Sequence, residues 1–185
     1  MLFDGYKFDL RLYVLVTSIS PLVVHMLGDG LVRLCTTRYE EPTEENLDEK
    51  RLHLTNYSLN KNSDTFQKSK ADDEGSKRSV HALLEHLAAQ GVDERRVWDN
   101  IGAGTTTCDP DPDPNSGVAA TGDIVCKTII AAQPAMSASY KHFMAKQPHL
   151  AGASCTCFEI YGFDVLLDEG PNIYMKHTYL HIRMC

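Results

Sequence analysis

The chain has 185 residues, of which 43% are hydrophobic and 23% charged, and its formal net charge is -7. This composition is typical of one globular domain with a substantial core, and it excludes a wholly disordered chain. The acidic balance argues against general nucleic-acid binding, which needs a basic surface, although it leaves room for a local basic pocket.

At their start, residues 7–16 alternate strictly between charged and apolar side chains, as a half-buried β-strand does. The charged face carries Lys7, Asp9 and Arg11. The pattern alone favours a solvated outer face with local ion pairing. Because same-face residues lie roughly 6.5–7 Å apart, the alternative is a face that follows a charged ligand such as a nucleotide.

Two further apolar runs, residues 22–27 and 31–36, are separated by Gly28-Asp29-Gly30. Asp-Gly tolerates positive φ, so this segment predicts a hairpin turn. Together with a turn at residues 18–21, it predicts an antiparallel meander of three strands. Arg33 is the charged residue of the returning strand and needs a partner, either a structural ion pair or an anionic ligand.

Residues 39–51 are acidic and polar, which indicates an exposed loop, and residues 53–61 form a polar loop or helix entrance. Ser79 is expected to cap a helix that Gly91 ends. Asp93 is expected to cap a shorter helix that contains Trp98, with Trp98 as a core anchor.

Residues 102–122 contain four glycines and three Asp-Pro pairs, and they predict an extended, solvated, disordered insertion. A calcium loop is the alternative, but the spacing is not that of an EF-hand. Asp123 is expected to start another helix, which Pro134 ends or kinks.

Residues 157–167 form a strongly apolar strand that contains Asp164. An unpaired carboxylate there would be costly, so Asp164 needs an arginine partner or a hard metal ion such as magnesium. The six cysteines show no Cys-x-x-Cys spacing, and Cys155-x-Cys157 is a weak metal or redox signal. We expect reduced thiols in a cytoplasmic protein, since residues 1–6 do not resemble a signal peptide and no apolar run reaches the roughly 20 residues of a membrane span.

Four segments, in this order, resemble the tubulin–tyrosine ligase-like family: Lys-Phe-Asp-Leu-Arg-Leu-Tyr-Val-Leu-Val (7–16), Asp-Gly-Leu-Val-Arg (29–33), His-Leu-Thr-Asn-Tyr-Ser (53–58) and Cys-Phe-Glu-Ile-Tyr-Gly-Phe-Asp (157–164). Asn-Leu-Asp (46–48) and Gly-Ser-Lys-Arg (75–78) are most similar to its polyglutamylase branch. The resemblance spans residues 7–168 apart from the insertion. It implies that residues 1–185 are a partial catalytic domain of ATP-grasp type, an α/β (α+β) fold with an antiparallel sheet and flanking helices.

The resemblance also implies an activity. The family uses ATP and magnesium to convert a carboxylate into an acyl phosphate, which the amine of an amino acid then attacks. In the polyglutamylase branch, free L-glutamate is joined to glutamate side chains of tubulin C-terminal tails. The expected setting is therefore the microtubule cytoskeleton, with the cilium or basal body as a narrower location. We expect a monomer that binds neither nucleic acid nor membrane.

Site residues follow from the same resemblance, residue by residue. Lys7, Asp9, Thr55 and Asn56 would bind ATP, with Asp9 on the ribose hydroxyls. Arg11 and Arg33 would be catalytic, with Arg11 toward the phosphates or the acceptor carboxylate. Arg33, Tyr57, Ser58 and Lys77 would bind glutamate, with the planar fork of Arg33 on its carboxylate. Asp164 would bind magnesium.

The chain departs from the family pattern at its end. The family continues into Leu-Leu-Glu-Val-Asn, whose Glu and Asn complete the magnesium site, whereas residues 169–185 form a divergent tail with neither in the expected place. The upstream lobe of the family is also absent. We therefore expect a fragment that is inactive by itself. The alternatives are a non-catalytic microtubule-binding module, which the acidic net charge disfavours, and an unstable truncated product.

Overall fold

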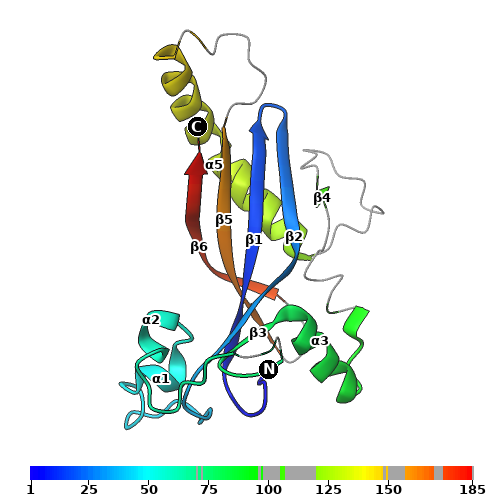
Figure 1. Ribbon diagram of the computed structural model, residues 1–185, viewed down its shortest axis with the longest axis vertical. Helices are drawn as coiled ribbons and strands as arrows, with labels where there is room; N and C mark the ends of the chain where they lie inside the picture. Colours follow the sequence, from blue (N-terminus) through cyan, green and yellow to red (C-terminus); the bar gives the residue numbers. More distant parts are fainter. Residues whose placement is uncertain are drawn as a thin grey trace.

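The computed structural model describes residues 1–69, 71, 73–95, 97, 105–106, 120–147, 149, 157–168 and 173–184, with only the backbone considered at 105–106, 120–123 and 173–184. Within these residues the centre is a six-stranded sheet of order β3-β2-β1-β5-β6, with β4 paired to β2 (Figure 1). The strands are β1 (Phe8–Ile19), β2 (Leu22–Leu34), β3 (Lys77–Ser79), β4 (Thr105–Thr106), β5 (Phe158–Leu167) and β6 (Ile173–Met184). The helices are α1 (Lys50–His53), α2 (Tyr57–Asn60), α3 (Val80–Ala89) and α5 (Ala120–Ala145). The predicted α+β class with an antiparallel sheet is confirmed.

The first two strands form one long hairpin, so the predicted three-strand meander is wrong. β1 turns into β2 at Ser20 and Pro21, and β2 then continues through Gly28-Asp29-Gly30 without reversing. Neither glycine has the positive φ that the predicted turn requires. The register instead moves from Leu12 opposite Gly30 to Val14 opposite Met26, which marks a β-bulge in β2.

Asp29 explains why a bulge replaces the turn. Its carboxylate oxygen Oδ1 accepts hydrogen bonds from the backbone N–H of Gly30 at 2.7 Å and of Val80 at 3.1 Å. The second bond ties the bulge to the first residue of α3. A side chain that is typical of turns therefore serves a tertiary contact, which residues 28–30 alone do not reveal.

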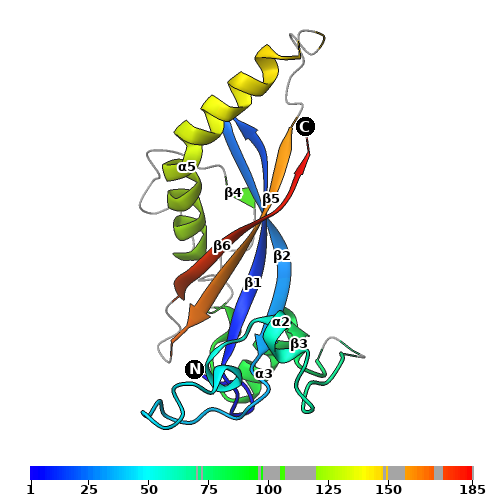
Figure 2. The same ribbon diagram turned by 90° about the vertical axis from the view of Figure 1, so that its left-hand side faces the viewer.

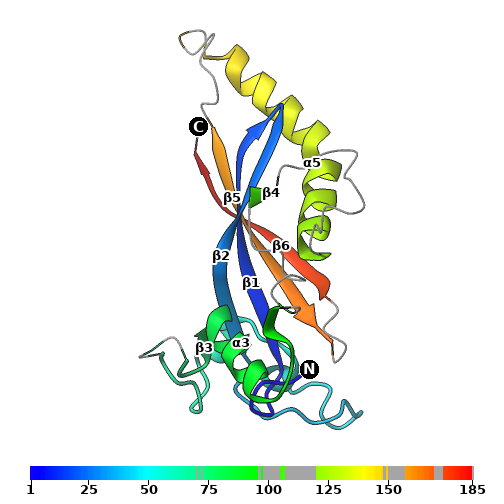
Figure 3. The ribbon, with the colours of Figure 1, turned by 90° about the vertical axis from the view of Figure 1, so that its right-hand side faces the viewer.

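The apolar face of β1 forms the core, as its alternation predicts. Phe8, Leu10, Leu12, Val14 and Val16 are buried. They belong to one cluster with Leu83 of α3 and with Val125 and Ile129 of α5. α5 runs along one side of the long strands (Figures 2 and 3), whereas α3 lies at one end of the sheet, with α1 and α2 across the strands from it (Figure 1).

The helix signals at Ser79 and Gly91 hold in the described residues, whereas α5 begins at Ala120 and not at the expected Asp123. Ser79 Oγ accepts a hydrogen bond from the N–H of Ala82 at 3.0 Å, and Gly91 follows α3 with φ of +80°. α5 continues through Pro134, so the proline does not end the helix, which bends along its length (Figure 2). No helix in the described part of the chain is long and apolar enough to cross a membrane.

Part of the predicted disordered insertion is ordered. Thr105–Thr106 form β4 against β2, and residues 120–122 lie in α5. The rest of residues 102–122, and also Trp98, lie outside the described residues. Val97, from the helix that Asp93 was expected to cap, is fully buried.

The last two strands bring the end of the chain back to its beginning. β5 pairs antiparallel with β1, and β6 pairs antiparallel with β5. The predicted divergent tail therefore contributes a strand beside β5. The register sets Arg11 opposite Asp164 and Asp164 opposite His177.

Candidate functional site

The charged face of β1 meets charged residues on both neighbouring strands. Asp9 lies opposite Arg33 of β2, and Arg11 lies opposite Asp164 of β5. Because side chains two residues apart on a strand share a face, these four project from the same face of the sheet. Cross-strand pairing thus places together residues that are up to 155 positions apart in the sequence, from Asp9 to Asp164.

Arg33 bridges the two carboxylates. Its Nε donates to Asp9 Oδ1 at 2.8 Å, and its Nη2 donates to Asp9 Oδ2 at 2.6 Å. The same Nη2 lies 2.8 Å from Asp164 Oδ2. Arg11 completes the row by donating from Nε and Nη2 to the two oxygens of Asp164, with an Nη2–Oδ2 distance of 3.1 Å. We refer to Asp9, Arg33, Asp164 and Arg11 as the ionic network.

Three residues of the ionic network are buried, and Arg11 is partly buried. Asp9 is 0% exposed, Asp164 2% and Arg33 8%. Thr55, itself 1% exposed, donates from Oγ1 to Asp9 Oδ2 at 2.6 Å. The solvated-face interpretation is therefore wrong for Asp9, although the ion pairing that it invoked is present. Whether the face also follows a nucleotide stays a prediction.

Burial and pairing act in opposite directions on the charges. Burial favours the neutral form of Asp164, but hydrogen bonds and charges of Arg11 and Arg33 outweigh it and lower the pKa of that carboxyl below its ordinary value. Burial likewise opposes the charge on Arg33, yet Asp9 and Asp164 raise the pKa of that guanidinium above its ordinary value. Asp164 and Arg33 therefore remain charged at neutral pH.

A second group of predicted residues lies beside the network. Lys77 of β3 is the cross-strand partner of Arg33, and its Nζ lies 3.7 Å from the ring centroid of Tyr57. Tyr57 is 44% exposed and Ser58 is also exposed at the start of α2. The structure thus brings together Arg33, Lys77 and Tyr57, three of the four residues expected to bind glutamate, with Ser58 adjacent in the chain.

Two predicted ATP contacts, Lys7 and Asn56, lie at the edges of this region. Lys7 directly precedes β1, and its backbone C=O accepts from the N–H of Cys35 at 2.8 Å. Asn56 precedes α2 and makes no side-chain capping hydrogen bond. Asp9, by contrast, has both oxygens engaged by Arg33 and Thr55, so contact with a ribose would require it to exchange one of these bonds.

Asn60 is a buried polar residue that carries no assignment from the sequence. It is 1% exposed, and its side chain bonds to Thr36 on one side and to the backbone of residues 54 and 56 on the other. The polar run 53–61 marks the segment, but no pattern separates Asn60 from its exposed polar neighbours.

Asp164 can offer a magnesium ion one carboxylate. Both of its oxygens accept from arginine, and the described residues contain no group of three or more His, Cys, Asp or Glu that could hold a metal. Magnesium commonly binds through one or two carboxylates together with substrate phosphates. The Asp164 carboxylate fits this way of binding if the ion displaces an arginine from it. Protein ligands alone would not complete the site.

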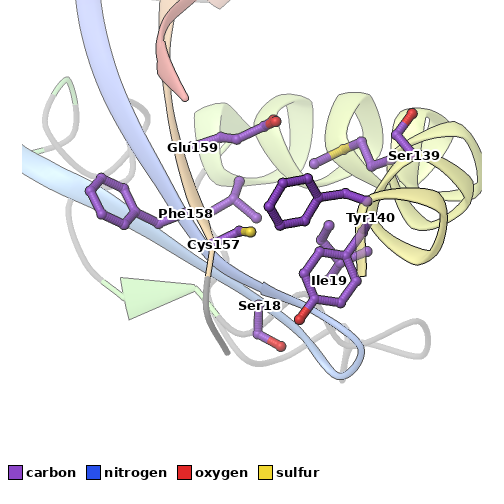
Figure 4. A pocket seen from close by; sticks show the side chains of 10 residues that line it. Ser18, Ile19, Ser139, Tyr140, Cys157, Phe158 and Glu159 are labelled. Atoms are coloured by element: carbon purple, nitrogen blue, oxygen red, sulfur yellow. The ribbon is translucent and has the colours of Figure 1, made fainter. Parts of the chain in front are cut away.

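The described cavities lie elsewhere on the sheet. One of about 120 Å³ lies between α5 and the far ends of β1 and β5, where Ile19, Tyr140 and Cys157 line it (Figure 4). None of the predicted site residues lines this cavity. The ionic network therefore lies outside this cavity.

Comparisons with known proteins agree on one family. A family model described as the tubulin-tyrosine ligase family matches residues 1–108. The chain is 40% identical to tubulin polyglutamylase TTLL7 of Mus musculus over 91% of its length, covering 16% of that protein. It is 40% identical to tubulin polyglutamylase ttll6 of Danio rerio and 38% identical to tubulin polyglutamylase TTLL11 of Homo sapiens, in each case over 90% of the chain. It spans 18% and 20% of the lengths of these two relatives.

Proposed function

This chain belongs to the tubulin-tyrosine ligase family, and we propose that it is part of a ligase that adds glutamate to glutamate side chains of tubulin C-terminal tails. The names of its relatives supply the tubulin substrate and the added amino acid. The place of action is accordingly the microtubule cytoskeleton, and a cilium or basal body is the narrower proposal. Because residues 169–185 depart from the family pattern, we propose that the 185-residue chain alone is inactive.

The proposed reaction has two steps. The acceptor carboxylate attacks the γ-phosphorus of ATP, so that an acyl phosphate forms and ADP leaves. The amine of free glutamate then attacks the acyl carbon, the amine loses a proton, and phosphate leaves as the isopeptide bond forms. Phosphoryl transfer of this kind is catalysed mainly by positioning and by stabilising negative charge.

The observation that carries this proposal is the position of the two arginines on one face of the sheet. Their planar guanidinium groups already bind carboxylates bidentately, which is the geometry that a substrate carboxylate or phosphate would use. Arg11 would stabilise the transferring phosphoryl group, and Arg33 would hold the carboxylate of the incoming glutamate.

The neighbouring residues complete the proposal. Lys7, Thr55 and Asn56 would face ATP, and Tyr57, Ser58 and Lys77 would line the amino-acid site. Asp9 would contact the ribose only after releasing a present partner. A magnesium ion held by Asp164 would neutralise charge on the phosphates.

A chimera tests this function. Residues 1–168 of this chain replace the corresponding residues of Mus musculus TTLL7, so that the relative supplies its own sequence after that point, and glutamate incorporation into microtubules is measured. We expect activity, and we expect Arg11→Ala to reduce kcat by about 100-fold or more, as removal of a charge-stabilising donor does elsewhere. Arg95→Ala, the same change at an exposed position, serves as the control and should be neutral. A folded Arg11→Ala chimera with full activity would contradict the assignment.

A non-catalytic microtubule-binding module is the second candidate. It is favoured by one observation, namely that the ionic network satisfies its own charges. Co-sedimentation of the chain with microtubules across a salt series separates the two. A chimera that binds microtubules without ligating glutamate supports the module, whereas no binding at low salt removes it.

A further inference from the structure

The side chain of Asn60 uses each of its hydrogen-bonding positions. Its Oδ1 accepts from the N–H of Thr36 at 3.0 Å and from Thr36 Oγ1 at 2.8 Å. Its Nδ2 donates to the C=O of Leu54 at 2.8 Å and to that of Asn56 at 3.0 Å. A primary amide has two donors and one oxygen with two lone pairs, so the side chain is fully satisfied while buried.

These four bonds join two segments that both lead to the ionic network. Thr36 follows the end of β2 and lies three residues after Arg33. Leu54 and Asn56 flank Thr55, whose hydroxyl donates to Asp9 Oδ2. Asp9 in turn accepts two hydrogen bonds from Arg33. The contacts therefore close a circuit from Arg33 through Asp9, Thr55 and Asn60 back to β2.

Within this circuit, Thr55 restrains the orientation of the Asp9 carboxylate. Asp9 and Asp164 both bind Nη2 of Arg33, at 2.6 Å and 2.8 Å. Because the Thr55 hydroxyl holds Asp9 Oδ2, it limits rotation of that carboxylate and keeps Arg33 directed toward Asp9. Loss of this restraint would let Arg33 move toward Asp164.

We propose that Asn60 is a positioning residue that sets the orientation of Arg33 through Thr55 and Asp9. Asn60 touches no reacting group, and it acts by holding the backbone on both sides of Thr55. Its importance for ligation rests on the proposed function, in which Arg33 holds the carboxylate of glutamate.

The direct test is Asn60→Asp in the full chain. This change keeps the shape of the side chain, removes both Nδ2 donors and places a negative charge beside two carbonyl oxygens. The readout is hydrogen exchange of the Arg33 Nε–H, measured by nitrogen-detected NMR, because this group donates to Asp9 Oδ1. We expect exchange to accelerate about tenfold, as the loss of a buried hydrogen bond predicts. Asn62→Asp adds the same charge at an exposed position and should leave the exchange rate unchanged.

A double variant separates positioning from general loosening. Thr55→Val removes the hydroxyl and retains the shape. If Asn60 acts through Thr55, Asn60→Asp accelerates Arg33 exchange in the wild-type background and adds nothing when Thr55→Val is already present. Additive effects in the double variant would overturn the proposal.

A milder variant covers the case in which Asn60→Asp does not fold. Thr36→Val removes one of the two bonds to Asn60 Oδ1 and leaves the backbone N–H bond in place. We expect Arg33 exchange to accelerate in the same direction by a smaller factor. An unchanged exchange rate in a folded Thr36→Val chain would count against the circuit.

Activity of the chimera distinguishes this inference from the proposed function. If the chimera ligates glutamate, Thr36→Val should raise KM for glutamate several-fold with a smaller change in kcat, since Arg33 is displaced rather than removed. If the chimera does not ligate but Arg33 exchange responds as described, the proposed function fails and the positioning role stands. If it ligates and neither exchange nor KM responds, the positioning role fails alone.

Discussion

At the scale of single residues, the ionic network shows how three buried charges and the partly buried Arg11 are held together in the protein. Bidentate hydrogen bonds offset the free-energy cost of burying these charges. Along the network the charges alternate in sign, in the order Asp9, Arg33, Asp164 and Arg11. Under the proposed function, a substrate carboxylate or phosphate would replace Asp164 on an arginine, and that arginine would stay paired.

The lowered pKa of Asp164 predicts a pH dependence of stability. The folded state favours the ionised carboxyl, so its contribution is fully present above the unfolded pKa of about 4 and is lost as pH falls through the lower folded value. We expect the urea midpoint to fall between about pH 5 and pH 2, and to fall less in Asp164→Asn. Asp73→Asn, at an exposed position, is the control and should keep the wild-type slope. Equal slopes in the wild-type and Asp164→Asn chains would show that Asp164 contributes nothing.

At the scale of elements, the bulge in β2 positions both the site and α3. Gly30 lies where β2 approaches the backbone of Arg11, and an added Cβ would stand 2.6 Å from the backbone oxygen of Arg11. Gly28, two residues earlier, has no neighbouring atom within 4 Å of such a Cβ. The two glycines of one short motif therefore have different roles, the first in open space and the second in a close strand contact.

This difference predicts that the same substitution destabilises the protein at Gly30 and has little effect at Gly28. Gly30→Ala should lower the free energy of unfolding by about 1–3 kcal/mol, because β1 and β2 must separate locally to admit the methyl group. Gly28→Ala is the matched control and should change it by less than about 0.5 kcal/mol. Chemical denaturation of the two variants measures both values. Equal destabilisation would mean that the bulge, rather than the contact with Arg11, sets the requirement for glycine.

At the scale of the whole molecule, the site depends on pairing between distant parts of the chain. Asp164 reaches Arg11 only because β5 returns beside β1. α5 packs on the opposite, apolar face of that sheet, where Ile129 is 2% exposed and the adjacent Ile130 is 39% exposed. The core contacts of α5 thus support the sheet that carries the charged residues.

The docking of α5 can be tested with its two adjacent isoleucines. Ile129→Ala should destabilise the chain by about 2–5 kcal/mol, because it leaves a cavity against the sheet. Ile130→Ala removes the same atoms from a partly exposed position and should cost less than half as much. Thermal or urea unfolding followed by circular dichroism provides the comparison. A similar loss of stability in both variants would show that packing of the inward face of α5 does not stabilise the protein.

The local sequence determined much of the secondary structure. Alternation in residues 7–16 predicts β1 and its buried face, and Ser79 and Gly91 predict the limits of α3. These features depend on neighbours a few residues away, so short patterns carry them. The ordered motifs also predicted the family before any comparison, and they named the arginines and aspartates that the structure brings together.

Tertiary structure alone decided how those residues are used. Residues 28–30 have the composition of a turn, but the bond from Val80 to Asp29 holds them in a bulge. Asp9 reads as a surface charge, yet Arg33 and Thr55 enclose it, and Asn60 carries no visible signal. The physical reason is the same for residues 28–30, Asp9 and Asn60. Each is held by a hydrogen bond to a residue that is distant in sequence, and only the folded chain brings that residue into place.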